Sequence, residues 1–328
     1  MKKTLIVVLV VVSIAAFAVL HADTSPQVYG RLHLSLDHLG NQEDSALNLS
    51  SNSSRLGFKG EMYIMPGLSA IYQLEGTVNV DVRGGQIATR DSYGGINGEF
   101  GSIRLGYFDT PLKTIRSRTD FFGDQIGDAR NMTLGNDYRF RNSIGYTSPK
   151  FGLVTLDAQY SVDQNNATTA TDNDDWALST SAFIREKDFY AGAAYEIRND
   201  SDDSETAMRL GASIKLQAIR INAFFQHYSA DHDAITIGGG AGYSMDDLML
   251  KGQLYMVSMD GDDNNGILLA LGADYKLSGN VRLLSAFAMT MNNDNAAFSS
   301  SGGGHGSTLI PVSGDNTMSI SMGLRIDI

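Results

Sequence analysis

The feature that most constrains this chain is an alternation of apolar and polar side chains that recurs from residue 27 to residue 328. In the last segment, every second residue from Met318 to Ile328 is apolar. The residues between them are Ser319, Ser321, Gly323, Arg325 and Asp327. A β-strand turns successive side chains to opposite faces, so this segment has one apolar face and one polar face. Alternating segments of about ten residues are typical of transmembrane β-barrels, whose outer face meets lipid and whose inner face meets water.

Polar interruptions separate the alternating segments from one another. The short interruptions are residues 65–67, 98–101, 149–152, 186–188, 217–218, 245–247 and 278–280. The long ones are residues 39–52, 82–89, 110–140, 163–175, 199–205, 229–233, 259–265 and 292–316. Seven short and eight long connections join sixteen strands, and all the short ones fall at the same end because the two kinds alternate. We therefore predict an all-β fold, a closed antiparallel transmembrane β-barrel of 16 strands with short periplasmic turns and long extracellular loops.

A soluble β-sandwich is the main alternative for an all-β chain with alternating strands. Sandwiches of the immunoglobulin type contain about seven to nine strands, far fewer than this chain provides. Glycine is abundant, with 35 residues, and proline is scarce, with 5, which suits strands joined by tight turns. The barrel is therefore the favoured interpretation.

The composition excludes several kinds of site. The chain has no cysteine, so it can form neither a disulfide nor a thiolate metal centre. Its formal charge of −12 argues against nucleic acid as a partner. If the chain forms a pore, the same negative charge favours the passage of cations. Acidic clusters in the long connections are more simply explained by solubility than by calcium binding, and we predict neither a metal site nor a cofactor.

Residues 1–22 predict a secretion signal. Lys2 and Lys3 precede an uncharged, mainly apolar run at residues 4–20, and cleavage after Ala18 or after Ala22 is compatible with the small residues there. A membrane-anchoring helix is the alternative, but the run of 17 residues is shorter than the ~20 that a spanning helix needs. We predict that residues 23–328 form a single β-barrel domain outside the cytoplasm.

Four stretches carry a more specific signal. They are VYGRL at 28–32, SRLGFKGE at 54–61, the segment from RDSYGG at 90–95 to FGSIRLG at 100–106, and RNSIGY at 141–146. With them, the chain resembles the general diffusion porins of Gram-negative outer membranes over essentially all of its predicted mature length. It departs from that pattern at Ile328, where such chains commonly end in Phe, and at residues 62–65, which carry methionines in place of an acidic or Asn-rich turn.

The resemblance implies several properties of the chain. It implies a homotrimer of sixteen-stranded barrels in the outer membrane, each with the third long loop folded into the lumen as a constriction. It also implies contact with outer-membrane lipid and lipopolysaccharide, and recognition of the C-terminal strand by the assembly machinery. The expected function is passive diffusion of ions and small hydrophilic solutes through a water-filled channel.

The candidate site is a constriction with one basic wall and one acidic wall. Arg31, Arg55 and Arg90 fall on the polar parity of the early strands, and the resemblance implies that they form the basic wall. Lys59 and Arg104 share that parity but could lie nearer a rim. The alternative for each arginine is ordinary ion pairing within the lumen.

The acidic wall is predicted in the long segment 110–140, which exceeds the usual length of a structureless connection. Its candidates are Asp120, Asp124 and Asp128, of which Asp124 and Asp128 are expected to project into the passage. The adjacent pair Phe121 and Phe122 could fix the loop to the wall. The alternative is a solvated loop tip, and basic residues in the same segment, Arg116 and Arg118, obscure its net charge.

Other functions remain as alternatives. A substrate-selective channel for a sugar, carboxylate or phosphate is the nearest one. A barrel with a plugged lumen would need bulky apolar residues pointing inward, whereas the inward rows read as polar. An enzyme is not predicted, because nucleophile, zinc and phosphate-loop motifs are absent from the sequence.

Overall fold

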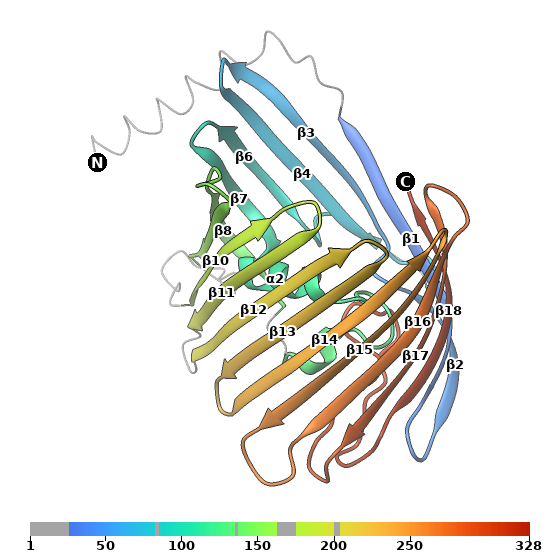
Figure 1. Ribbon diagram of the computed structural model, residues 1–328. Helices are drawn as coiled ribbons and strands as arrows, with labels where there is room; N and C mark the ends of the chain where they lie inside the picture. The colour runs from blue at the N-terminus through green and yellow to red at the C-terminus, as the bar shows by residue number, and fades with distance from the viewer. Residues whose placement is uncertain (1–25, 83–84, 135–136, 163–174, 200–203) are drawn as a thin grey trace.

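The computed structural model describes residues 26–82, 85–134, 137–162, 175–199 and 204–328 (Figure 1). The predicted signal at residues 1–22, with its cleavage sites at Ala18 and Ala22, lies outside these residues. The strands are β1 (Gln27–Gly40), β2 (Ser45–Ser51), β3 (Arg55–Met65), β4 (Leu68–Val78), β5 (Gly85–Gln86), β6 (Ser92–Gly98), β7 (Gly101–Asp109), β8 (Arg139–Thr147), β9 (Val154–Ser161), β10 (Trp176–Arg185), β11 (Phe189–Asn199), β12 (Ser204–Leu216), β13 (Ile219–Ser229), β14 (Asp233–Met245), β15 (Leu248–Met259), β16 (Gly266–Lys276), β17 (Val281–Asn292) and β18 (Met318–Asp327). The helices are α2 (Pro111–Thr119) and the 3₁₀ helix η2 (Ala129–Met132).

These strands form a closed antiparallel barrel with 16 strand positions around its circumference, which confirms the predicted fold. β2 and β3 both pair with β1, and β5 and β6 both pair with β4. Each of these two pairs therefore occupies one strand position in the barrel. The sheet closes where β1 pairs with β18, from Arg31 opposite Asp327 to Gly40 opposite Met318. The terminal residue takes part, because Ile328 and Gly30 exchange backbone hydrogen bonds of 2.9 and 3.0 Å.

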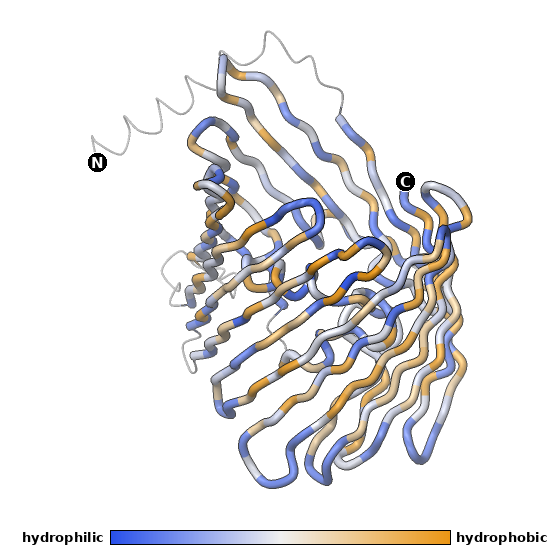
Figure 2. The backbone as a smooth tube through the Cα atoms, viewed as in Figure 1, coloured by the Kyte–Doolittle hydropathy of each residue, from blue (hydrophilic) through white to orange (hydrophobic). Residues whose placement is uncertain are grey.

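The alternation of the sequence becomes the two faces of the wall. In β12, Met208 and Leu210 are 42% and 44% exposed on the outer face, whereas Arg209 between them is fully buried inside. Hydrophobic residues alternate with hydrophilic ones along the strands in Figure 2. Polar inward side chains and apolar outward ones are the arrangement of a barrel that sits in lipid. Within the described ranges, the helices are too short or too polar to traverse a bilayer.

The segment predicted as a first long loop, residues 39–52, is mostly strand. β2 occupies Ser45–Ser51, and only residues 41–44 connect it to β1. Leu47 and Leu49 point outward at 67% and 57% exposure, so the alternation continues through this segment. The serines and asparagines around these two leucines masked that alternation, because polar residues are also the usual signal of a loop.

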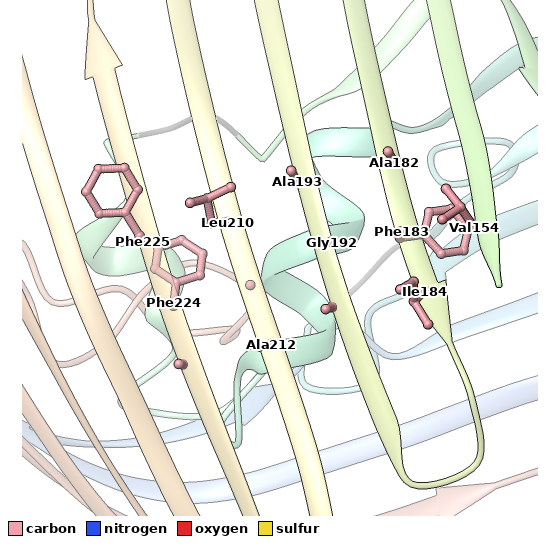
Figure 3. A pocket seen from close by; sticks show the side chains of 13 residues that line it. Val154, Ala182, Phe183, Ile184, Gly192, Ala193, Leu210, Ala212, Phe224 and Phe225 are labelled. Carbon is pink, nitrogen blue, oxygen red and sulfur yellow. The ribbon is translucent and has the colours of Figure 1, made fainter.

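The third long loop folds into the lumen and lies against the inner wall. Helix α2 contacts β9 to β13, and Figure 3 shows it behind the wall at Gly192, Ala193 and Leu210. Thr110 caps its N-terminus by accepting a hydrogen bond of 3.2 Å from the backbone N–H of Lys113, and Pro111 begins the helix. The helix therefore starts where the sequence carries a strong helix-start signal.

Glycines on the inner face let the helix approach the wall. A Cβ added at Gly192 would lie 2.6 Å from Cδ1 of Ile115, and one added at Gly211 would lie 2.7 Å from Cγ2 of the same side chain. A larger residue at either position would require the Ile115 side chain, or α2 itself, to shift. Further along the loop, a Cβ added at Gly127 would lie 2.5 Å from the Cβ of Ala270.

The inward rows are not polar throughout, and in this respect the sequence interpretation is wrong. Phe183, Phe224, Tyr255 and Leu268 are buried on the inner face. They belong to apolar clusters that also contain residues of the inserted loop, namely Leu112, Ile115, Ala129 and Met132. The loop needs an apolar surface to pack on. These four wall residues supply that surface.

The two faces make a testable prediction about stability. Leu210 lies near the middle of β12 on the outer face, so Leu210→Arg places a charge in the region predicted to meet hydrocarbon. We expect this variant to lower the free energy of unfolding by about 2–4 kcal/mol in lipid vesicles, measured by guanidinium titration. Leu210→Ala is the matched control. Equal effects of the two substitutions would contradict a lipid-facing position.

Candidate functional site

Asp124 lies at the centre of a group of arginines that comes from both the wall and the inserted loop. Its Oδ2 is 3.7 Å from Nη1 of Arg31 and 3.8 Å from Nη1 of Arg55, and its Oδ1 is 2.7 Å from Nη2 of Arg130. The backbone of Asp124 is left-handed, with φ of +64°, a conformation that Asp tolerates better than most residues. Burial opposes ionisation, but Arg130 and then Arg55 hold the pKa of the Asp124 carboxyl below its usual value. This residue therefore faces the basic wall as a carboxylate.

A second carboxylate, Glu75 of β4, holds the other end of the arginine row. Its Oε1 is 2.5 Å from Nε of Arg90, and its Oε2 is 3.8 Å from Nε of Arg55. Tyr29 donates a hydrogen bond of 2.9 Å to the same carboxylate. Arg90 lies just before β6 and is held to the wall by Glu75. The structure thus brings Arg31, Arg55 and Arg90 together in one row.

The arginine row is partly open to the lumen, and among its carboxylate partners Glu75 is the most deeply covered. The side chains of Arg31, Arg55 and Arg90 are 17–19% exposed, whereas that of Glu75 is 8% exposed. Arg31 also binds Asp327 of the last strand, with 2.8 Å between Nε and Oδ1. Fixed ion pairs of this kind keep long side chains in one orientation.

The structure places Asp120 and Asp128 behind the loop and away from the passage. Both carboxylates bind Nη1 of Arg116, at 2.7 and 3.1 Å, and their side chains are 1% and 0% exposed. Burial, together with nearby Asp128, raises the pKa of Asp120 to about 7. Against burial, Arg130 and Arg116 hold the pKa of Asp128 well below its usual range. These two residues organise the loop, which leaves Asp124 as the acidic residue opposite the wall.

Lys59 and Arg104 lie on the wall but away from Asp124. Nζ of Lys59 is 5.1 Å from the ring centroid of Tyr29, and Cζ of Arg104 is 4.5 Å from that of Phe108. Lys59 is four residues nearer the short-turn end of its strand than Arg55. They extend the basic surface towards that end.

The inserted loop is anchored by a buried chain of charges that the sequence analysis missed. Asp137 binds Nε of Arg116 in α2, and its other oxygen is 2.7 Å from Nη1 of Arg209 in β12. Burial alone would raise the pKa of Asp137, but Arg116 and then Arg209 lower it to about 2. Arg209 lies on the predicted inward parity, yet nothing in a single sequence pairs it with a loop residue 72 positions away.

The last long loop, residues 293–317, also reaches the site. The carbonyl of Gly304 accepts a hydrogen bond of 2.9 Å from Ser53, and the carbonyl of Ser300 accepts one of 2.7 Å from the backbone N–H of Gly127. A Cβ added at Gly304 would lie 1.9 Å from Nη2 of Arg130 and 2.1 Å from Oδ1 of Asp124. The loop therefore lies against the Arg130–Asp124 pair. The third and the last long loops therefore both shape the charged region around Asp124.

A family model described as Gram-negative porin matches residues 7–295. The chain belongs to the Gram-negative porin family. It is accordingly a β-barrel protein of the Gram-negative outer membrane.

Individual relatives agree with this assignment. The chain is 30% identical over 167 residues to the major outer membrane protein P.IB of Neisseria sicca, which covers 49% of this chain and 47% of that protein. The chain spans about half the length of the curated relatives it matches. Among solved structures, an anion-selective porin from Comamonas acidovorans has a TM-score of 0.81 at 21% identity, over 93% of this chain and 99% of that one. The outer membrane protein OmpT of Vibrio cholerae, in its trimer form, has a TM-score of 0.72 at 17% identity over 93% and 99%.

The contact of Gly304 with the charged pair makes one prediction. Gly304→Ala should push Arg130 or Asp124 from its place, because the added methyl group overlaps both side chains. We expect a change in single-channel conductance in planar bilayers with the barrel still folded. Gly279→Ala, in a turn where an added Cβ meets nothing within 4 Å, is the matched control. Identical conductances of the two variants would show that the last loop does not shape this zone.

The Asp137 anchor makes a second prediction, which depends on pH. Because its folded pKa of about 2 is below the ~3.9 of an unfolded Asp, its stabilising contribution is complete above about pH 4 and is lost as pH falls towards 2. We expect the wild-type channel to gain current noise as pH falls through that window, since α2 loosens when Asp137 is protonated. Asp137→Asn should show the noise at neutral pH, whereas Asp246→Asn, in an exposed turn, should not. Quiet Asp137→Asn channels would argue against the anchor.

Proposed function

We propose that the chain forms a water-filled channel for passive diffusion of ions and small hydrophilic solutes. Its narrow zone is the row of Arg31, Arg55 and Arg90 facing Asp124, and Lys59 and Arg104 extend the basic wall. The observation that carries this proposal is the approach of the loop carboxylate to within 3.7–3.8 Å of two wall arginines. Rows of fixed charge across a water passage orient polar solutes while leaving binding weak enough for release. The chemistry of such a passage needs no nucleophile, and we propose no enzymatic activity.

We further propose that the narrow zone favours anions. Arg31, Arg55, Arg90 and Arg130 meet there, and they are permanently charged. The carboxylates within ion-pairing distance of these arginines that open most to solvent are Asp124 and Asp327, since Glu75 and Asp128 are more deeply covered. The field of the narrowest region governs selectivity more than the net charge of −12 does. The lean towards cations that the composition suggested is therefore replaced by the opposite proposal.

We also propose a homotrimer. The Vibrio cholerae protein with the same fold is described in a trimer form, and this fold similarity supports the proposal. Contacts with outer-membrane lipid and lipopolysaccharide, and recognition of the C-terminal strand by the assembly machinery, belong to the same proposal. Small hydrophilic solutes are the proposed cargo.

A substrate-selective channel for a carboxylate or phosphate is the second candidate. The cationic row supports it, and so does the anion-selective porin from Comamonas acidovorans, whose fold this chain shares. A selective channel would show current steps that one solute blocks at low concentration. A diffusion channel would pass several small anions with similar permeability.

The arginine row makes a direct prediction. Arg55→Ala combined with Arg90→Ala should enlarge conductance and shift the reversal potential in a potassium chloride gradient towards cations. The reason is that the double variant widens the passage and leaves Glu75 without its two arginine partners. Lys150→Ala, which removes an exposed cation at a short turn, is the control. Unchanged permeability ratios would remove these arginines from the narrow zone.

A further inference from the structure

A small cavity lies on the inner face of the barrel at the short-turn end of β10 to β13. Its volume is about 140 Å³, and its lining includes Arg118 at the end of α2. The wall contributes Arg185, Lys215 and Arg220. Arg185, Ser213 and Lys215 belong to the inward parity, since their neighbours Ile184, Ile214 and Leu216 belong to the outward one. The cavity therefore opens to the lumen and not to lipid.

Five basic side chains line this cavity, Lys187 of the short turn among them, and none of the five has a carboxylate partner among the described residues. No carboxylate oxygen of those residues lies within 4.0 Å of the charged nitrogens of these five side chains. Glu186, an acidic residue of the lining, is already bound by Lys150 at 2.9 Å. Asp188 is the other acidic residue there, so the cluster keeps a net positive charge.

Elsewhere on the inner wall, arginines meet carboxylates directly. Arg139 binds both Asp91 and Asp109, at 2.7 and 2.9 Å, and Arg209 binds Asp137. In the cavity, by contrast, burial and the charge of Arg185 lower the pKa of Arg118. Like charges held together without a counter-ion attract an anion from solution.

A buried hydroxyl group also points to a ligand. Tyr190 lines the cavity with 6% of its surface exposed, and its hydroxyl has no hydrogen-bond partner in the part of the chain that the structure describes. Buried hydroxyls without partners are uncommon, because the group has lost its water. Ser213 lines the same cavity and supplies a second hydroxyl. An oxyanion here would receive hydrogen bonds from hydroxyls as well as from guanidinium groups.

We infer that this cavity binds a small multiply charged oxyanion, such as inorganic phosphate, as it passes the short-turn end of the lumen. The cavity volume of about 140 Å³ is well above the ~10–15 Å³ that a single water needs. That volume leaves room for one tetrahedral oxyanion. Guanidinium groups bind such anions through paired N–H donors, and three of the five cations are arginines. Arg118 and Arg185 are the central binding residues, with Lys215, Arg220 and Tyr190 around them.

This inference deepens the proposed channel function and rests on it for its biological meaning. β10 to β13 occupy the eighth to eleventh strand positions around the barrel, whereas the arginine row begins on the first two positions. The basic cavity thus lies across the barrel from Arg31 and Arg55. An anion that leaves the narrow zone would meet a second positive surface before it reaches the short-turn end.

The test is the binding of inorganic phosphate to the purified, detergent-solubilised protein, measured by isothermal titration calorimetry at fixed ionic strength. We expect saturable binding that sulfate displaces. Arg118→Gln combined with Arg185→Gln should weaken it at least tenfold, and Tyr190→Phe should weaken it a few-fold. Lys276→Gln combined with Arg282→Gln removes the same charge at the same end of the lumen, on β16 and β17, and should leave phosphate binding unchanged.

Three results would overturn the inference. They are the absence of saturable phosphate binding, equal loss in the two double variants, and loss only when Arg31 and Arg55 are replaced, which would move the site to the narrow zone. Binding of vesicles containing anionic phospholipid, lost in the Arg118/Arg185 variant without any effect on phosphate, would assign the cluster to a lipid headgroup and would also overturn it. The calorimetric readout does not need an open channel, so failure of ion conduction with intact phosphate binding would refute the channel function alone.

Discussion

Closure of the hydrogen-bonded ladder is the constraint on which the rest of this structure depends. A sheet in lipid cannot leave an edge, because each unpaired backbone group there has no water to bind. The pairing of β1 with β18 removes that edge and brings together residues 296 positions apart, such as Arg31 and Asp327. The last strand therefore does two things at once. It seals the wall and places a carboxylate beside the basic row.

Inside the sealed wall, the second requirement is to hold a long loop in a water-filled space. Apolar packing alone supplies part of the solution, since Phe122 and Ile126 are buried against Ala270, Ala286 and Ala288. Buried ion pairs between the loop and the wall supply the other part. Arg116 pairs with three carboxylates of the loop, and one of them, Asp137, also pairs with Arg209 of the wall, which ties α2 to β12. Breaking one member of such a buried set leaves another charge without a partner, so the anchor acts as a unit.

The sequence predicts the strands well because a single periodicity encodes them. The short turns at Gly67, Gln217 and Asp246 take positive φ, as tight turns between antiparallel strands require, and the outward leucines and methionines follow in order. The row of Arg31 and Arg55 is also readable, because parity alone places both side chains inside. What parity cannot show is which inward residues meet the loop. Phe224 and Arg209 share the same face, and only the three-dimensional path of α2 distinguishes their roles.

The acidic residues of the inserted loop show why charge counts do not determine a pore. Asp120, Asp124 and Asp128 are equally spaced and chemically identical, yet the loop buries the first and the last against Arg116 and turns only the middle one towards the wall. The left-handed backbone at Asp124 and the contact with Gly304 decide that orientation. Most of the carboxylates that give the chain its acidity lie elsewhere, so they contribute little to the field in the narrow zone once salt screens them over about 10 Å. In the proposed narrow zone, the sign of the field follows from which side chains face water, and four arginines meet the partly exposed Asp124 and Asp327 there.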